Sequence, residues 1–178
     1  TEITSYSPGE YIHLNDAAPR SKDTVAHEAG HNTMYNAYGN YMPPNDCVSP
    51  HYIEKFGGTN CGWTEGWGDF TSMLVWGDPY YTFANGSVTD MESPTRGTFG
   101  WDNGTTCEGR VAGALWDIID GNNETTNDFY TDPVAPIWDT FWNVNNDTFC
   151  PFWDATRGYG IKRSRDNELY QNTIDSCS

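Results

Sequence analysis

Two histidines four positions apart are the residues of this sequence best suited to chemistry. Residues 27–31 read HEAGH, an H-E-x-x-H pattern inside a run of helical character. Histidines at this spacing share one face of a helix, with Cβ atoms about 5–6 Å apart, so His27 and His31 can bind one Zn²⁺ ion. Glu28 is turned by about 100° around the helix and lies beside the metal. A carboxylate there can accept a proton from zinc-bound water and pass it to a leaving amine.

A second motif supplies the ligand that two histidines lack. Residues 64–69 read TEGWGD and place two carboxylates four residues apart, at the start of another apolar run. Catalytic zinc takes three protein ligands and keeps an open position, and Glu65 suits the third place. Asp69, one turn later, can accept the outer N–H of a zinc histidine and fix its tautomer. The H-E-x-x-H pattern alone also occurs by chance, and the second motif makes one catalytic zinc ion the better interpretation.

The two motifs together resemble the gluzincins, the metallopeptidase clan that includes thermolysin and fungalysin. The shared pattern is H-E-x-x-H on one helix and E-x-x-x-D on the next. The resemblance implies that His27, His31 and Glu65 bind the zinc ion, that Glu28 is the general base and that Asp69 supports a zinc ligand. Metzincins instead need a third histidine and a glycine, where this chain has Ala37 and Met34.

The fold expected from this resemblance is α+β and zincin-like, with a small N-terminal β-sheet over an active-site helix and a mainly helical remainder. At 178 residues the chain has the size of a single domain. Residues 2–14 alternate and contain a Ser7-Pro8-Gly9 turn, which predicts a hairpin in a β-rich part of about residues 1–20. Tyr11–Leu14 is either an edge strand that pairs with extended substrate or an ordinary sheet strand.

Three longer helices are predicted from periodicity and capping residues. The first begins at a Ser21 or Asp23 cap and runs to Tyr38, after which Gly39 supplies a left-handed stop. The second runs from a Thr64 cap to Gly77. The third covers residues 108–119. We expect loops over residues 40–63 and 78–104, short aromatic helices packed under the active-site helices, and a closing helix over residues 168–174.

The group that stabilises the oxyanion is not evident from the motifs. Thermolysin uses a histidine downstream of the glutamate ligand, but no histidine follows His51 here. Our ordered candidates are Tyr52, then Tyr159 and Tyr170, with Arg110 and His51 as alternatives. His51 is otherwise a fourth zinc ligand or a surface histidine. Arg110 either reaches the cleft from the start of its helix or pairs with Glu108 or Asp117 on the surface.

The cysteines and sequons indicate a secreted protein. Five cysteines without a C-x-x-C pair argue against cysteine-bound zinc and for disulfides. Spacing leaves the connectivity open, and the pairing we predict is Cys47 with Cys61 and Cys150 with Cys177, with Cys107 unpaired. N-x-S/T sequons stand at Asn85, Asn103, Asn123 and Asn146.

An oxygen-rich segment follows the third predicted helix and would suit calcium, because hard cations take carboxylate and amide oxygens. Its members are Asp117, Asp120, Asn122, Asn123, Glu124 and Asp128. The spacing is not that of an EF-hand loop, and a solvated acidic loop is the alternative interpretation.

The overall charge restricts the partners. A formal net charge of -16 at pH 7 argues against nucleic acid, and no apolar run of about 18 residues predicts a membrane span. We expect a monomer that acts on polypeptide substrates.

The chain begins with Thr1 and has 26 residues before His27, which suggests an upstream prosegment. The basic residues at 157, 162, 163 and 165 would bind such a prosegment or balance local charge.

A secreted zinc endopeptidase is the function that these features predict. An aminopeptidase would use the same zinc site and grip the substrate amine with Glu108 or Glu92. A carbohydrate-binding module would explain 8 Trp and 11 Tyr, but not two metal-ligand motifs. A glycosidase would need a carboxylate pair such as Glu28 and Glu65, and the paired histidines argue against it.

Overall fold

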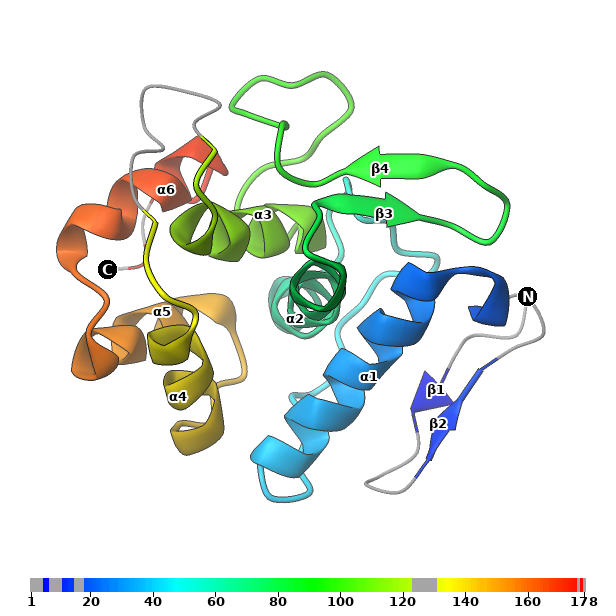
Figure 1. Cartoon of the computed structure of the whole chain (residues 1–178), viewed down its shortest axis with the longest axis horizontal. Helices are drawn as coiled ribbons and strands as arrows, with labels where there is room; N and C mark the ends of the chain where they lie inside the picture. Colours follow the sequence, from blue (N-terminus) through cyan, green and yellow to red (C-terminus); the bar gives the residue numbers. More distant parts are fainter. Residues whose placement is uncertain (1–4, 7–10, 15–17, 123–130, 176, 178) are drawn as a thin grey trace.

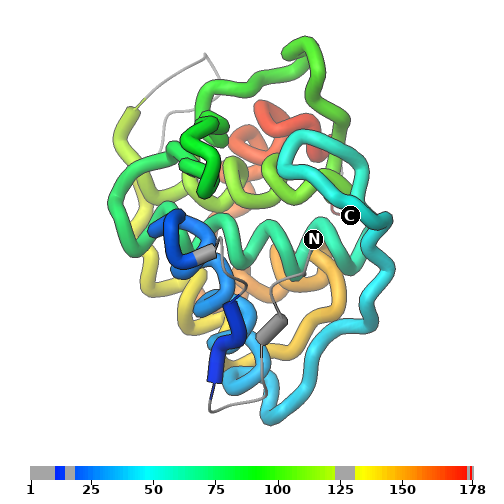
Figure 2. The backbone as a smooth tube through the Cα atoms, turned by 90° about the vertical axis from the view of Figure 1, so that its right-hand side faces the viewer, coloured from blue at the N-terminus to red at the C-terminus, as the bar shows by residue number. Residues whose placement is uncertain are grey.

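The computed structural model describes residues 5–6, 11–14, 18–122, 131–175 and 177. It is an α+β structure in which helices dominate. Helix α2 (Thr59–Trp76) lies between α1 (Lys22–Ala37) and α3 (Glu108–Ile119) and packs against both (Figures 1 and 2). The two motif segments therefore stand on neighbouring helices. No helix in the described part of the chain is long and apolar enough to cross a membrane.

Helix α1 begins and ends as its sequence predicts. The Ser21 Oγ atom accepts a hydrogen bond from the Thr24 N–H at 2.9 Å, so Ser21 is the N-cap. After the helix, Gly39 takes the left-handed conformation with φ of 66°. Asp23, the other possible cap, has a different role. Its buried carboxylate accepts hydrogen bonds from the Ser72 hydroxyl at 3.0 Å and from the Thr82 N–H at 2.9 Å. It therefore links α1 to α2 and to the segment that follows α2.

The N-cap of helix α2 is Gly58, six residues before the predicted cap at Thr64. The sequence before Thr64 is rich in glycine and polar residues, which favours a loop, and the N-cap Gly58 offers no side chain. The carboxylate of Asp46, from the preceding loop, accepts from the backbone N–H groups of Thr59, Asn60 and Cys61 at 2.9, 3.2 and 2.7 Å. A distant acid thus satisfies the free donors of the first turn, which local sequence could not reveal.

The strands lie partly outside the regions predicted for them. Strands β1 (Ser5–Tyr6) and β2 (Ile12–His13) form the antiparallel N-terminal hairpin beside α1 (Figure 1). The predicted Ser7-Pro8-Gly9 turn and the start of the chain lie outside the described residues. A second hairpin, β3 (Tyr80–Thr82) with β4 (Val88–Asp90), occupies a region predicted as loop.

Aromatic residues from the C-terminal third form the core beneath α2, as predicted. Helices α4 (Ala135–Asn143) and α5 (Phe149–Ala155) carry most of these rings. The Trp67 ring stacks on Phe141 with centroids 3.6 Å apart, and Trp63 stacks on Phe152 at 4.4 Å. The closing helix α6 (Asp166–Gln171) is shifted towards the N-terminus from its predicted range.

The disulfides follow the predicted pairing. Cys47 is bonded to Cys61 and Cys150 to Cys177, and the remaining Cys107 is buried. The first bond joins the loop after α1 to the first turn of α2. It therefore holds that loop against the helix that carries Glu65.

Candidate metal centre

Three ligand-type atoms from α1 and α2 converge at one point. The Nε2 atoms of His27 and His31 are 3.0 Å apart. The Oε2 atom of Glu65 lies 3.1 Å from the first and 3.3 Å from the second. Both histidines are buried, and the Glu65 side chain is 16% exposed. The packing of α1 on α2 thus brings together the three residues that the sequence predicted as metal ligands.

The donor set and its separations fit a zinc ion. A tetrahedral Zn²⁺ with bonds of 2.0–2.1 Å holds its ligand atoms roughly 3.3 Å apart. The electrostatics agree. Burial lowers the pKa of His27, but Tyr81, Asp69 and Glu65 together raise it well above its usual value. Burial raises the pKa of Glu65, whereas His31 and His27 hold it well below its usual range. The histidines therefore favour the carboxylate form of Glu65, while the surrounding groups favour a positive charge at His27.

Glycines inside the helices allow the two motif segments to approach. A Cβ atom on Gly68 would lie 2.8 Å from Nδ1 of His27, and one on Gly30 would lie 2.9 Å from the Cα atom of Gly68. Gly66 faces the other way, and its Cβ would lie 2.8 Å from the side chain of Val111 on α3. Gly68 thus serves the contact with α1, and Gly66 the contact with α3.

Asp69 lies behind His27, as the E-x-x-x-D spacing predicts. Its Oδ1 atom is 2.8 Å from Nδ1 of His27, and its side chain is almost fully buried. An N–H donated from Nδ1 to this carboxylate leaves the lone pair of Nε2 directed towards His31 and Glu65. The tautomer that a metal ligand requires is therefore favoured by a buried carboxylate.

The cluster opens into a cleft of about 770 Å³. Glu28, which is 4% exposed, lines it beside the two histidines. The opposite wall comes from the loop between α1 and α2, and another wall from the β3–β4 hairpin. Loop and hairpin residues in the lining include Met42, Val48, His51, Tyr52, Phe83, Asn85 and Thr89.

Tyr81 belongs to this site and was not found from the sequence. Its ring centroid lies 6.1 Å from that of His27, and its hydroxyl donates to Thr24 Oγ1 at 3.1 Å. Burial raises the pKa of Tyr81 to about 12, so it stays a neutral donor. The signal was present in the Asn85-Gly86 pair between β-formers, since Asn-Gly is a strong hairpin turn.

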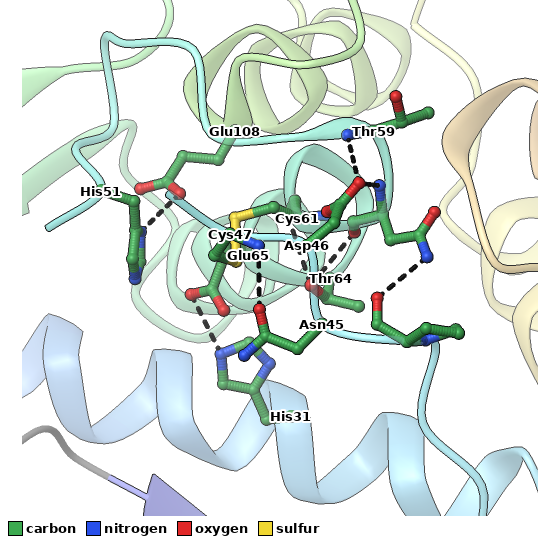
Figure 3. Close-up of a disulfide and its surroundings, with 12 residues drawn as sticks. His31, Asn45, Asp46, Cys47, His51, Thr59, Cys61, Thr64, Glu65 and Glu108 are labelled. Carbon is green, nitrogen blue, oxygen red and sulfur yellow. Dashed lines mark hydrogen bonds and ion pairs between the residues drawn. A yellow bond between two sulfur atoms is a disulfide. The ribbon is translucent and has the colours of Figure 1, made fainter. Parts of the chain in front are cut away.

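A second group of ligand-type residues lies in the same cleft. His51, Cys61 and Glu108 have ligand atoms within 4.8 Å of one another (Figure 3). The Cys61 sulfur is bonded to Cys47 and is not a thiolate. Nδ1 of His51 lies 2.9 Å from Oε2 of Glu108, so these two groups form a pair with each other.

Only some of the residues predicted to stabilise the oxyanion line the cleft. Tyr52 lines the cleft and is 55% exposed. Tyr159 and Tyr170 are not among the described residues that line it. For Arg110, the structure differs from both predicted roles.

The Arg110 side chain is fully buried and donates to the carbonyl oxygens of Asp102, Pro94 and Thr95 at 3.1, 2.7 and 3.2 Å. It stacks over Trp101 with its guanidinium carbon 5.2 Å from the ring centroid. Arg110 thus fastens the loop before α3, and neither the predicted cleft contact nor the surface pairing is formed.

The segment proposed for calcium is only partly described. Asn123, Glu124 and Asp128 lie outside the described residues. Asp117 is buried and accepts from Nδ2 of Asn172 at 2.7 Å, while Asn122 donates to Glu92 at 3.3 Å. Asp117 therefore faces the interior contact between α3 and the end of α6, not a surface loop. Calcium binding stays a prediction.

The sequons and the basic residues can also be placed. Asn85 and Asn103 are exposed, whereas Asn146 is buried and donates to the Val144 carbonyl at 2.9 Å. Asn123 lies outside the described residues.

Two of the four basic residues near the C-terminus have acidic partners, Arg157 with Asp166 and Arg165 with Asp132. Local charge balance therefore accounts for these two.

The comparison with protein families agrees with the class that the motifs suggest. The sequence profile described as the mycolysin C-terminal domain, a domain of thermolysin-like peptidases, matches residues 1–173. The chain therefore belongs to the mycolysin C-terminal domain family. The comparisons with curated proteins and with solved structures gave no match.

Proposed function

We propose that this chain is a zinc-dependent endopeptidase domain. The observation that carries the proposal is the convergence of His27, His31 and Glu65, whose ligand atoms are 3.0–3.3 Å apart at the base of an open cleft. Membership of the mycolysin C-terminal domain family adds a metallopeptidase context, at the level of the family only.

Zinc bound by these residues would supply Lewis acidity, which makes a water molecule more acidic and a peptide carbonyl more electrophilic. Glu28 lines the cleft from the helix position between the two histidines. It accepts a proton from the attacking water and delivers that proton to the amide nitrogen as the C–N bond breaks. Asp69 keeps the His27 ring in the orientation and tautomer that a ligand needs.

The cleft favours an endopeptidase over an aminopeptidase. An aminopeptidase needs a free carboxylate to bind the substrate amine, and neither predicted acid suits this role. Glu108 is hydrogen-bonded to His51, and Glu92 is buried beside Asn122 and does not line the cleft. A volume of about 770 Å³ between loop and hairpin accommodates several side chains of a polypeptide.

The two non-peptidase alternatives lose support for specific reasons. Three of the tryptophans that suggested a carbohydrate-binding module, Trp63, Trp67 and Trp153, are at most 1% exposed and belong to the core, where a sugar does not reach them. A glycosidase pair of Glu28 and Glu65 is disfavoured because Glu65 lies within 3.3 Å of both His27 and His31.

Secretion remains part of the proposal. Two disulfides suit an oxidising compartment, and the sequons at Asn85 and Asn103 are exposed. An upstream prosegment stays a proposal, to which the exposed side chains of Lys162 and Arg163 offer a basic contact.

The test measures bound zinc and casein hydrolysis on one preparation, for the wild type and Glu28→Gln. We expect one zinc per chain in both proteins and a loss of activity of about 100- to 10,000-fold in the variant. Wild-type activity that survives a chelator, or a Glu28→Gln protein as active as the wild type, would contradict the proposal.

A further inference from the structure

We propose that His51 donates the hydrogen bond that holds the carbonyl oxygen of a bound peptide, and that Glu108 positions His51 for this contact. The inference rests on the proposed peptidase function and assigns a role that the sequence motifs leave open. His51 would touch the substrate, whereas Glu108 would act only through His51.

The arrangement of the pair is the first observation. Nδ1 of His51 lies 2.9 Å from the Glu108 carboxylate, which is 5% exposed, while the imidazole is 35% exposed to the cleft. Figure 3 shows the ring reaching from the loop, with its second nitrogen directed away from Glu108. One ring nitrogen is therefore held by a buried acceptor, and Nε2 is left to a ligand in the cleft that Glu65 also lines.

The loop that carries His51 is fixed to both neighbouring helices. The Cys47–Cys61 disulfide joins it to α2, and the Asp46 carboxylate caps the same helix. On the other side, the Gly109 N–H donates to the Ile53 carbonyl at 2.9 Å at the start of α3. These contacts hold His51 in a constant position relative to Glu65, which a preorganised donor requires.

The charges around the pair make His51 a cationic donor. The hydrogen bond that His51 donates to Glu108 is the main cause that raises the pKa of His51 to about 9. Glu65 adds to this increase, while burial and His27 oppose it. Burial raises the pKa of Glu108 to about 7, with Asp69 and Glu65 acting in the same direction against His51. Between about pH 7 and 9 the pair is thus imidazolium and carboxylate. A charged donor makes the shorter and stronger hydrogen bond.

The competing donors are less suitable. The guanidinium of Arg110 is bound to three carbonyl oxygens away from the cleft. The Tyr81 hydroxyl donates to Thr24, inside the wall of the cleft. Tyr52 lies at the cleft with an exposed ring, but no buried acceptor in the described part of the chain holds it as Glu108 holds His51.

Kinetics on the zinc-loaded full chain form the first part of the test. We expect His51→Ala to lower kcat about 100-fold with little change in KM or zinc content, because the contact strengthens only in the transition state. His51→Gln, which keeps a donor, should recover part of the loss. Asn36→Ala, at an exposed position of α1 that does not line the cleft, is the control and should behave as the wild type.

Two further measurements distinguish a specific effect on His51 from a general loss of structure. In Glu108→Gln the alkaline limb of the kcat profile should move to lower pH, because His51 loses the carboxylate that keeps it protonated up to about pH 9. Long-range ¹H–¹⁵N spectra of the imidazoles should show that the pKa of His51 is lowered in this variant. The affinity for a phosphinic peptide, which carries tetrahedral oxygens, should fall in His51→Ala about as much as kcat.

The outcomes are distinguishable. Zinc-free or inactive wild-type protein would overturn the peptidase function and this inference with it. If the wild type is active and Glu28→Gln is not, the peptidase function stands. In that case, full activity of His51→Ala, or a larger loss in Tyr52→Phe than in His51→Ala, would overturn the role of His51 alone.

Discussion

The cleft contains two groups of metal-ligand residue types among the described residues, and they differ in what their atoms are free to do. In the first group, His27, His31 and Glu65 point their ligand atoms at one another. In the second, His51 and Glu108 pair with each other and the sulfur of Cys61 is bonded to Cys47. In each group the ligand-type atoms lie within 4.8 Å of one another, so the distances alone do not show which group can bind a metal.

The comparison teaches that the neighbours of a ligand decide its chemistry. Asp69 binds the outer nitrogen of His27 and leaves the inner nitrogen for a metal. Glu108 binds a nitrogen of His51 in the same way. The third member of this group among the described residues, the Cys61 sulfur, is oxidised and is not free to bind a metal. We therefore propose a metal centre for the first group and a charged hydrogen-bond donor for the second, although the residue types are similar.

The largest expected difference concerns zinc affinity. We expect His31→Ala to weaken zinc binding by about a thousandfold, because each ligand contributes several kcal/mol of metal-binding free energy. His51→Ala should bind zinc within a few-fold of the wild type. Competition with a fluorescent chelator measures both. Equal losses in the two variants would mean that the groups form one site.

Opening the first disulfide should convert the second group into a metal site. Cys47→Ser frees the Cys61 thiol beside His51 and Glu108, and it removes a cross-link between residues 14 apart, at a cost of about 3 kcal/mol of unfolding free energy. We expect a second bound Co²⁺ with a thiolate charge-transfer band.

Cys150→Ser is the matched control for this change. It opens the other disulfide, so a similar loss of stability should occur without the second cobalt ion. If Cys47→Ser binds a single cobalt ion without thiolate absorption, geometry and not oxidation excludes metal from the second group.

The smallest of the three effects concerns the support of His27. Asp69→Asn should weaken zinc binding by about 10- to 100-fold, since the charged acceptor that fixes the tautomer is lost. Isothermal titration with zinc measures the change. Asp78→Asn, at an exposed aspartate paired with Lys22, should leave zinc affinity as it is. An unchanged affinity in Asp69→Asn would show that His27 needs no such support.

Local patterns predicted the elements whose causes lie close in sequence. The Ser21 cap, the Gly39 end of α1 and the range of α3 follow from residues within one turn of the helix boundary. Other boundaries depend on distant groups. Helix α2 begins at Thr59 because Asp46 caps it, and Arg110 is buried because three carbonyl oxygens of a preceding loop surround it.

By itself, the sequence determined which side chains share a helix face. A four-residue spacing puts His27 with His31, and Glu65 with Asp69, whatever the rest of the fold. Only the tertiary structure decided that these two faces meet, because the approach depends on Gly30 and Gly68 at the crossing of α1 and α2. It also decided the partner of His51, since Glu108 is 57 residues away and reaches it only through the packing of α3 on α2.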